Sequence, residues 1–199
     1  MVTPLVLLVA AATAGGPEHP ATLEGVWAAL AEASALRASF QQTQHRRLFS
    51  RPLESAGTVT LQRPDRLRWE VDTPSPSVFV MRGSDVAVTY PALGVTESLS
   101  LRDRPELLSL ARALTVWMQA DLEQVRASYE VSLEGRTATL VPRDPALARW
   151  VSRVELTVAP EGRHVQRLAL HEPDGDRVEI GFSRVELDPT LAPAAFTLP

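Results

Sequence analysis

Residues that could bind a metal ion gather near the C-terminus, at His171, Glu172, Asp174 and Asp176. Imidazole and carboxylate groups are metal ligands, but a single histidine lacks the partner ligands that a zinc site needs. Asp174 is followed by Gly175, and an Asp-Gly pair is typical of the tip of a hairpin, where acidic residues are common without a metal. The sequence therefore predicts a hairpin turn here and no bound metal.

Catalytic chemistry finds no support in the sequence. The chain has no cysteine, which excludes disulfides, thiolate metal sites and a cysteine nucleophile. It contains no G-x-S-x-G motif, no P-loop and no dinucleotide-binding fingerprint, and neither His19 nor His164 has a serine in a nucleophile-elbow context. We therefore predict a protein that is not an enzyme and uses no cofactor.

A basic cluster stands at His45, Arg46 and Arg47. Such a cluster could attract an anionic partner or a lipid headgroup. The alternative interpretation is a polar, solvated connection between two strands.

Arg63 is a cation at the end of a predicted strand. If Thr58–Arg63 keeps one register, its side chain points to the same face as Val59 and Leu61, which we expect to be buried. A buried guanidinium needs acceptors, and the carbonyls of a covering helix or loop would supply them. The alternative is an arginine whose charged head reaches water beyond the end of the strand.

The elements that must position these residues follow from hydrophobic periodicity. The stretch from Gly57 to Pro91 alternates polar and apolar side chains between Pro, Gly and Asp turns, which predicts four short strands of an antiparallel meander. A helix is predicted after a Thr22 cap and another after Asp103, and strands return from Tyr129. The sum is a mainly β (α+β) fold, one antiparallel sheet of about ten strands with amphipathic helices covering one face.

Length and charge set further bounds. The chain has 199 residues and a net charge of −4, and it shows no basic stripe, which argues against nucleic-acid binding. Residues 2–14 form an apolar run that ends in Ala12-Thr13-Ala14, which is typical of a signal peptide and too short to span a membrane. We predict that residues 1–20 are a signal peptide and linker, and that 21–199 form one domain. An apolar N-terminus that is not a signal is the alternative.

Several motifs together resemble a known family. They are the block Gly57–Glu70 (Gly-Thr-Val-Thr-Leu-Gln-Arg-Pro-Asp-Arg-Leu-Arg-Trp-Glu), Pro74, Gly83, Tyr90-Pro91, the segment Ser39–Gln42, Glu172–Gly175 and the closing Phe196–Pro199. In these features the chain resembles the LolA-type lipoprotein carriers, over nearly its whole length after residue 20. The resemblance implies an incomplete, strongly curved antiparallel β-barrel of about ten or eleven strands. Helices would cover its concave face as a lid over an apolar cavity.

The resemblance also implies a function, site residues and partners. Members carry acylated lipoproteins across the periplasm, from an inner-membrane ABC exporter to an outer-membrane acceptor, and we expect this chain to act as a monomer. The family arginine that controls opening of the lid corresponds to Arg63. Met and aromatic side chains suit a surface that accepts flexible acyl chains, although each could equally be plain core. The candidates for the cavity and lid are Arg63, Val59, Leu61, Trp69, Phe79, Met81, Leu114, Trp117 and Met118.

Two departures from the family pattern keep alternatives open. Ala87 stands near the place of a tryptophan usual in the family, and Phe-Thr-Leu-Pro is followed by none of the C-terminal segment of the best-known carriers. The cargo could therefore be a glycolipid or a hydrophobic pigment in place of a lipoprotein. A protein of another class, an interaction or sensor module with the same fold and no lipid cargo, is the other alternative.

Overall fold

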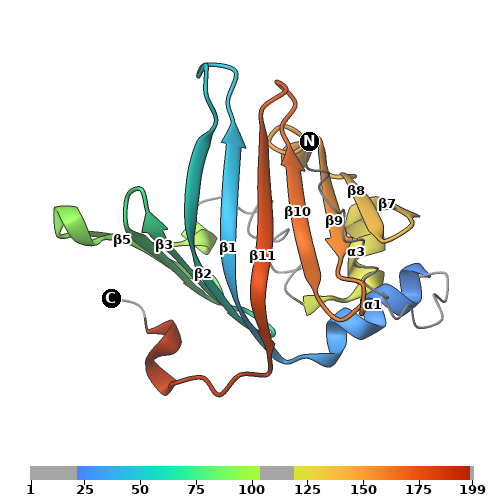
Figure 1. Ribbon diagram of the computed structural model, residues 1–199, viewed down its shortest axis with the longest axis horizontal. Helices are drawn as coiled ribbons and strands as arrows, with labels where there is room; N and C mark the ends of the chain where they lie inside the picture. Colours follow the sequence, from blue (N-terminus) through green and yellow to red (C-terminus); the bar gives the residue numbers. More distant parts are fainter. Residues whose placement is uncertain (1–21, 104–118, 198–199) are drawn as a thin grey trace, which may run out of the picture.

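The computed structural model describes residues 22–103 and 119–197, and its centre is a single antiparallel sheet of eleven strands (Figure 1). The strands are β1 (Ala35–His45), β2 (Leu53–Gln62), β3 (Arg66–Thr73), β4 (Ser77–Arg82), β5 (Asp85–Tyr90), β6 (Val95–Ser100), β7 (Tyr129–Glu134), β8 (Thr137–Pro142), β9 (Arg153–Val158), β10 (Val165–His171) and β11 (Arg177–Leu187). This number agrees with the ten or eleven strands that were predicted.

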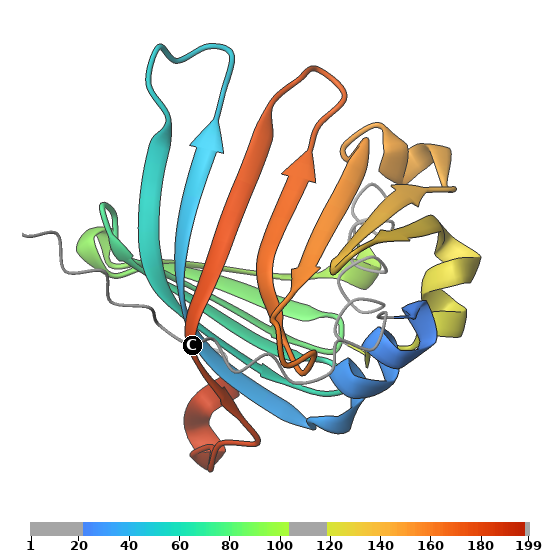
Figure 2. The ribbon, with the colours of Figure 1, turned by 45° about the vertical axis from the view of Figure 1, so that its right-hand side comes forward.

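The sheet consists of two meanders, a first of β1–β6 and a second of β7–β11, which are joined where β1 pairs with β11. Its order is β6-β5-β4-β3-β2-β1-β11-β10-β9-β8-β7, so β6 and β7 are the edges and the barrel stays open. β1 and β11 have 11 residues each and pair from Leu36–Leu187 to His45–Arg177. Figure 2 shows the strong curvature of the sheet. The predicted incomplete barrel is confirmed.

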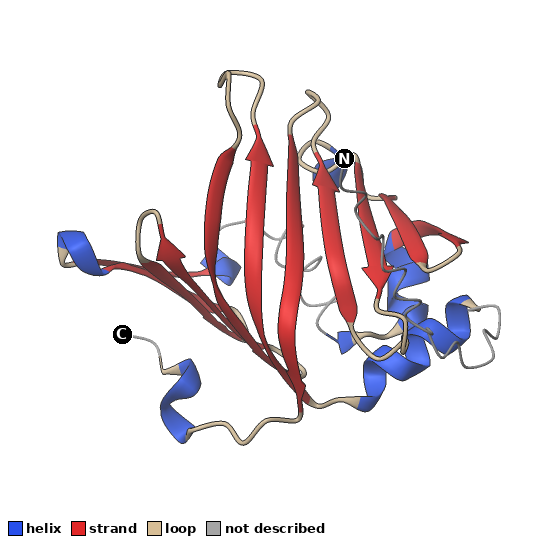
Figure 3. Ribbon diagram, in the orientation of Figure 1, coloured by secondary structure: helices blue, strands red, loops and turns tan. Residues whose placement is uncertain are grey.

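Short helices lie beside and between the strands (Figure 3). They are α1 (Leu23–Glu32), α3 (Leu122–Ser128), α4 (Pro145–Ala148) and the 3-10 turns η1 (Pro91–Leu93), η2 (Leu101–Asp103) and η4 (Pro193–Phe196). The predicted cap of α1 is present, because the Thr22 hydroxyl accepts a hydrogen bond from the Gly25 amide at 3.1 Å. Asp121 caps α3 in the same way. The helix predicted after Asp103 lies mostly outside the described residues.

One face of the sheet carries the apolar core, and we call it the inner face. Residues directly opposite each other on antiparallel strands point to the same face. Val59 pairs with Trp69 and Trp69 with Phe79, while Leu61 pairs with Leu67 and Leu67 with Met81. The same face continues through β11 to β9, where Ile180, Leu168 and Leu156 are opposite one another.

Helix α1 covers the inner face over the second meander. Val26 and Trp27 of α1 are buried in one cluster with Val125 of α3 and with Leu140 and Val154 of β8 and β9. A second cluster surrounds Phe40 and Val59, and a third surrounds Met81 and Val86. The apolar stripe of α1 therefore supplies the cover that an antiparallel sheet needs on one face.

The opposite face of the first meander is covered by the C-terminal segment. Val80 and Ala87 pair with each other and point away from the inner face, yet each is only 1% exposed. Turn η4 packs against β3 and β4, and its Phe196 is 5% exposed. Burial of this aromatic ring gives Phe196 a packing role.

Two boundaries differ from those expected. β2 begins at Leu53, directly after the connection that follows β1, and not near Thr58. Pairing with β1 continues to Gln44–Leu53, so the long neighbouring strand extends β2 beyond its alternating segment. Arg63 lies one residue past the end of β2, at the start of the turn into β3.

Candidate functional site

Arg63 joins the turn after β2 to the end of α1. Its Nη2 donates a hydrogen bond of 2.9 Å to the carbonyl of Leu30, and its Nη1 donates to the carbonyl of Ala33. The Arg63 amide also donates to the carbonyl of Ser34, at 2.9 Å. Carbonyls in the last turn of a helix lack intrahelical partners and carry the negative end of the helix dipole. A guanidinium is well matched to them in both charge and geometry.

Burial and a nearby carboxylate act on the Arg63 guanidinium in opposite directions. Burial lowers the pKa of Arg63 from its ordinary value, and the charge of Asp188 partly opposes this. An arginine with a lowered pKa is still protonated near neutral pH, because its ordinary pKa is so high. Arg63 therefore contributes a half-buried positive charge that carbonyl oxygens must neutralise.

Asp188 holds the segment between α1 and β1 from the other side. Its Oδ1 accepts hydrogen bonds from the amide and hydroxyl of Ser34, at 2.7 and 2.8 Å, and from the amide of Ala35 at 3.0 Å. The Ser34 hydroxyl is the largest cause that lowers the pKa of Asp188, followed by these two amides. The segment that links α1 to the sheet is thus fixed by Arg63 on one side and by Asp188 on the other.

Aromatic side chains form the centre of the inner face. The Phe40 and Trp69 rings lie 4.2 Å apart between centroids at an interplanar angle of 33°, and the Phe182 ring meets Trp69 edge-on at 6.4 Å. Trp69 and Phe182 remain partly exposed, while Phe40 is buried. This stretch of apolar surface is adjacent to, and continuous with, the part that α1 covers.

Comparison with known proteins gives a consistent result. The family described as outer membrane lipoprotein carrier protein LolA matches residues 31–199. The chain belongs to the LolA family. An outer-membrane lipoprotein carrier protein of Dechloromonas aromatica is 24% identical over 179 residues, which cover 89% of this chain and 83% of that protein.

Two further comparisons concern a second relative and the fold. A protein of the same name from Chromohalobacter salexigens is 27% identical over 192 residues, covering 96% of this chain and 85% of its own. The fold is similar to that of an uncharacterized conserved protein from Thermus thermophilus, with a TM-score of 0.54, 11% identity and coverage of 88% and 93% of the two chains. The LolA family is a family of carriers, not a class of enzymes.

The structure brings together five of the predicted cavity residues of this LolA-family chain. Val59, Leu61, Trp69, Phe79 and Met81 all point to the inner face, by the register of β2, β3 and β4. Met81 is fully buried and Val59 nearly so, whereas the other three are partly exposed. The remaining candidates, Leu114, Trp117 and Met118, lie outside the described residues.

Sequence reasoning did not single out Phe40 or Phe182 as site residues, although both contact Trp69 or lie beside it. Their period-2 alternation places them on strands but gives no indication of which aromatic ring they meet. That information depends on the pairing of β1 with β11, in which Phe40 lies opposite Phe182.

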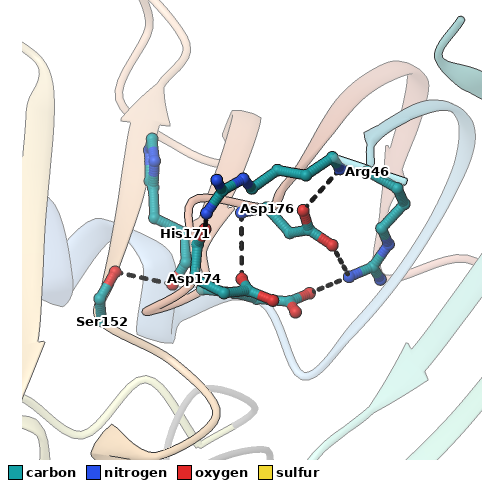
Figure 4. Close-up of polar contacts among 7 residues, drawn as sticks. Arg46, Ser152, His171, Asp174 and Asp176 are labelled. Carbon is teal, nitrogen blue, oxygen red and sulfur yellow. Dashed lines mark hydrogen bonds and ion pairs between the residues drawn. The ribbon is translucent and has the colours of Figure 1, made fainter. Parts of the chain in front are cut away.

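The acidic hairpin tip binds arginine side chains in this structure (Figure 4). Arg46 Nη1 lies 2.6 Å from Oε1 of Glu172 and 3.3 Å from Oδ2 of Asp176. The Arg47 amide donates to Asp176 at 2.8 Å, and its guanidinium donates to the carbonyl of Asp174 at 2.7 Å. The oxygens of Glu172, Asp174 and Asp176 lie within 4.8 Å of one another, a grouping that does not include His171. These contacts join the β10–β11 tip to the β1–β2 tip.

Among the described residues, no helix has the length and apolar character that crossing a bilayer requires.

Proposed function

We propose that this protein is a periplasmic carrier that shields the acyl chains of a lipoprotein against the inner face of its sheet. One observation carries the proposal. A partly exposed apolar surface surrounds Trp69, and the neighbouring helix α1 is fixed by hydrogen bonds from Arg63. Membership of the LolA family and relatives named outer-membrane lipoprotein carrier proteins support it. The protein acts by binding alone, without covalent chemistry.

Hydrophobic burial supplies the driving force. Each methylene group moved from water to an apolar surface contributes about 0.8 kcal/mol, so part of one acyl chain is sufficient for uptake. Access to the whole inner face requires α1 to move, which breaks the hydrogen bonds from Arg63 to Leu30 and Ala33. Acyl contacts replace these bonds, and a near balance between the two states lets the cargo leave again.

The residues proposed to meet the cargo are the inner-face side chains Val59, Leu61, Trp69, Phe79 and Met81, with Arg63 controlling α1. We further propose that Leu114, Trp117 and Met118 contribute to the cover. The partners would be an inner-membrane ABC exporter that loads the cargo and an outer-membrane acceptor that receives it, with the carrier acting as a monomer.

The decisive experiment is to purify the full chain from its own periplasm, extract it with organic solvent and analyse the extract and the protein by mass spectrometry. Acylated lipoprotein in stoichiometric amount is the expected result. Recovery of a glycolipid or pigment would show a different cargo, and protein free of any acylated molecule would contradict the proposal.

A fluorescence titration locates the binding surface. An acylated peptide should change the emission of the tryptophans, and Trp69→Phe should remove most of that change because Trp69 lies on the inner face beside Phe40. Trp150→Phe is the matched control, since Trp150 is 61% exposed in the connection between β8 and β9. If Trp69→Phe keeps the full change, the cargo binds elsewhere.

A further inference from the structure

The large exposed apolar side chains of the described residues belong to connections at the same end of the strands, although the twist of the sheet spreads these connections apart (Figure 1). The connections β1–β2, β3–β4, β5–β6, β8–β9 and β10–β11 all lie at this end, because the strands are antiparallel. The large apolar side chains that are exposed in the described part of the chain all lie in these connections or within two residues of them. They are Leu48, Phe49, Leu53, Tyr90, Leu93, Val95, Val141 and Trp150. The end that carries Arg63 has none of them.

The β1–β2 connection carries the most exposed of these apolar side chains. Leu48 is 94% exposed and Phe49 56% exposed, side by side between Arg47 and Ser50. The β1–β2 and β10–β11 tips extend beyond the rest of the sheet (Figures 1 and 2). A flat surface that approaches this end would therefore meet these two tips early. We call residues 46–52 and 172–176 the paired tips.

The paired tips hold Leu48 and Phe49 in an ordered loop. The Phe49 amide donates to the carbonyl of Arg46 at 2.9 Å, and the Arg47 amide donates to Asp176 at 2.8 Å. The ion pair between Arg46 and Glu172 joins the two tips directly (Figure 4). These hydrogen bonds and the ion pair thus hold two adjacent apolar side chains in contact with water. Their exposure costs free energy unless another apolar phase covers them.

The same loop provides positive charge around a shallow pocket. Its lining residues are His45, Arg46, Arg47, Phe49, Ser50, Arg51, Pro52 and Gly175. The three carboxylates of the β10–β11 tip already accept hydrogen bonds: Glu172 from Arg46, Asp176 from Arg46 and the Arg47 amide, and Asp174 from the Asp176 amide. They therefore repel an approaching anion less than free carboxylates would, while the Arg51 side chain is exposed. The paired tips as a whole carry as many acidic residues as arginines, but the pocket lining contains three arginines and no carboxylate, and that lining complements a phosphate group.

We propose that the paired tips dock this protein on a bilayer that contains anionic phospholipid. A headgroup phosphate lies in the pocket beside Arg47 and Arg51, and Leu48 and Phe49 enter the boundary between headgroups and acyl chains. Arginine next to apolar and aromatic side chains is the composition of interfacial membrane anchors. A bilayer fits better than free phosphate, which leaves Leu48 and Phe49 in water.

Docking of this kind goes beyond the proposed carrier function and does not depend on a bound cargo. It places the protein at a membrane surface with the Arg63 end of the sheet directed away. A negative result for docking would leave the mass-spectrometric test of cargo unaffected, so either proposal can be contradicted without the other.

Co-sedimentation of the full chain with vesicles tests the proposal. One set of vesicles is pure phosphatidylcholine and the other contains phosphatidylglycerol as well. We expect stronger binding to the anionic vesicles and weaker binding at high salt. Leu48→Ser should weaken binding about tenfold, since a buried leucine side chain contributes that much. Arg51→Gln should weaken binding about fivefold on the anionic vesicles only.

Leu93→Ser is the matched control. Leu93 is 74% exposed, but the strong twist of the sheet directs its β5–β6 connection away from the paired tips (Figure 1). This variant should bind like the unchanged protein. Equal binding to both vesicle types, no binding to either, or an equal loss in Leu93→Ser and Leu48→Ser would overturn the proposal. Complete release from vesicles by inorganic phosphate at the concentration of the lipid would show a phosphate site in place of a membrane anchor.

Discussion

The side chain of Asp188 accepts hydrogen bonds from the amide and the hydroxyl of Ser34, at 2.7 and 2.8 Å, across 154 residues of sequence. Ser34 lies between α1 and β1, and its carbonyl accepts a hydrogen bond from the Arg63 amide at 2.9 Å. Ser34, the residue at which α1 would pivot, is therefore held by residues that directly follow β2 and β11. Any movement of α1 must either preserve these contacts as a hinge or break them.

Asp188→Ala should loosen this segment and lower the thermal midpoint of unfolding by a few degrees, because three hydrogen bonds to one carboxylate oxygen are lost. Thermal unfolding followed by circular dichroism measures the effect. The exposed Glu130 on β7 gives the control, since Glu130→Ala should leave the midpoint unchanged. Equal effects of the two variants would show that Asp188 has no special role.

The pH dependence of stability should also report on Asp188. The pKa of Asp188 is lowered in the folded protein, chiefly by the Ser34 hydroxyl and by the Ala35 and Ser34 amides. A lowered folded-state pKa contributes stability that is complete above the unfolded-state pKa of about 4 and is lost as the pH falls through the folded-state pKa. The difference in stability between the unchanged protein and Asp188→Ala should therefore be constant at neutral pH and shrink in acid. A difference that grows in acid would refute this assignment.

The contacts between the paired tips should stabilise the protein modestly. Arg46→Met removes two ion pairs whose side chains are 13 to 29% exposed, and we expect a loss of about 1 kcal/mol in the free energy of unfolding. Urea denaturation measures it. Arg153→Met is a suitable control, because Arg153 pairs at 2.8 Å with Glu155 on its own strand and is 46% exposed. The control should change stability by much less; a larger loss from Arg153→Met would contradict the prediction.

The sequence was sufficient to predict that Arg63 would bond to backbone carbonyls. It was not sufficient to predict which residues supply those carbonyls. An inward-facing cation demands acceptors, which led to the expectation of carbonyls from a covering element. That these belong to Leu30 and Ala33 depends on how α1 sits at the end of the sheet, which is a tertiary property. Periodicity predicted α1 and the meander because these patterns are local.

Long-range polar contacts left no pattern in the sequence. Asp188 follows a strand and precedes a proline, which suggests only a turn, and nothing local connects it to Ser34. The acidic tip was correctly placed on a hairpin, but its partner Arg46 lies 126 residues from Glu172. The pairing of β1 with β11 brings such residues together, and strand order across a sheet of eleven strands is not encoded locally.

Export stays a prediction, because residues 1–21 lie outside the described part of the chain. The apolar run that ends in Ala12-Thr13-Ala14 should direct secretion and cleavage, so that the mature protein begins near Gly15. N-terminal sequencing of protein from the periplasm measures this. Leu7→Arg, which interrupts the apolar run, should retain the protein in the cytoplasm. Periplasmic protein that still begins with Met1 would contradict the prediction.

The last prediction concerns the control of α1 by Arg63. Arg63→Leu removes the donors to Leu30 and Ala33 and adds apolar surface next to the inner face. Both changes favour the state in which acyl chains occupy that face. We therefore expect the variant to bind acylated cargo at least as tightly as the unchanged protein.

Transfer should show the opposite effect. Closure of α1 through the Arg63 hydrogen bonds favours the empty protein, so their loss should slow transfer of cargo to an acceptor by about tenfold. Arg68→Leu is the matched control, since Arg68 is in the same hairpin but points to the opposite face and pairs with Glu70 at 2.9 Å. The measurement loads all three proteins with the same acylated cargo and follows its appearance in the acceptor. Equal transfer by Arg63→Leu and Arg68→Leu would show that the hydrogen bonds to α1 do not control release, and that the role of Arg63 is to fix the end of the helix.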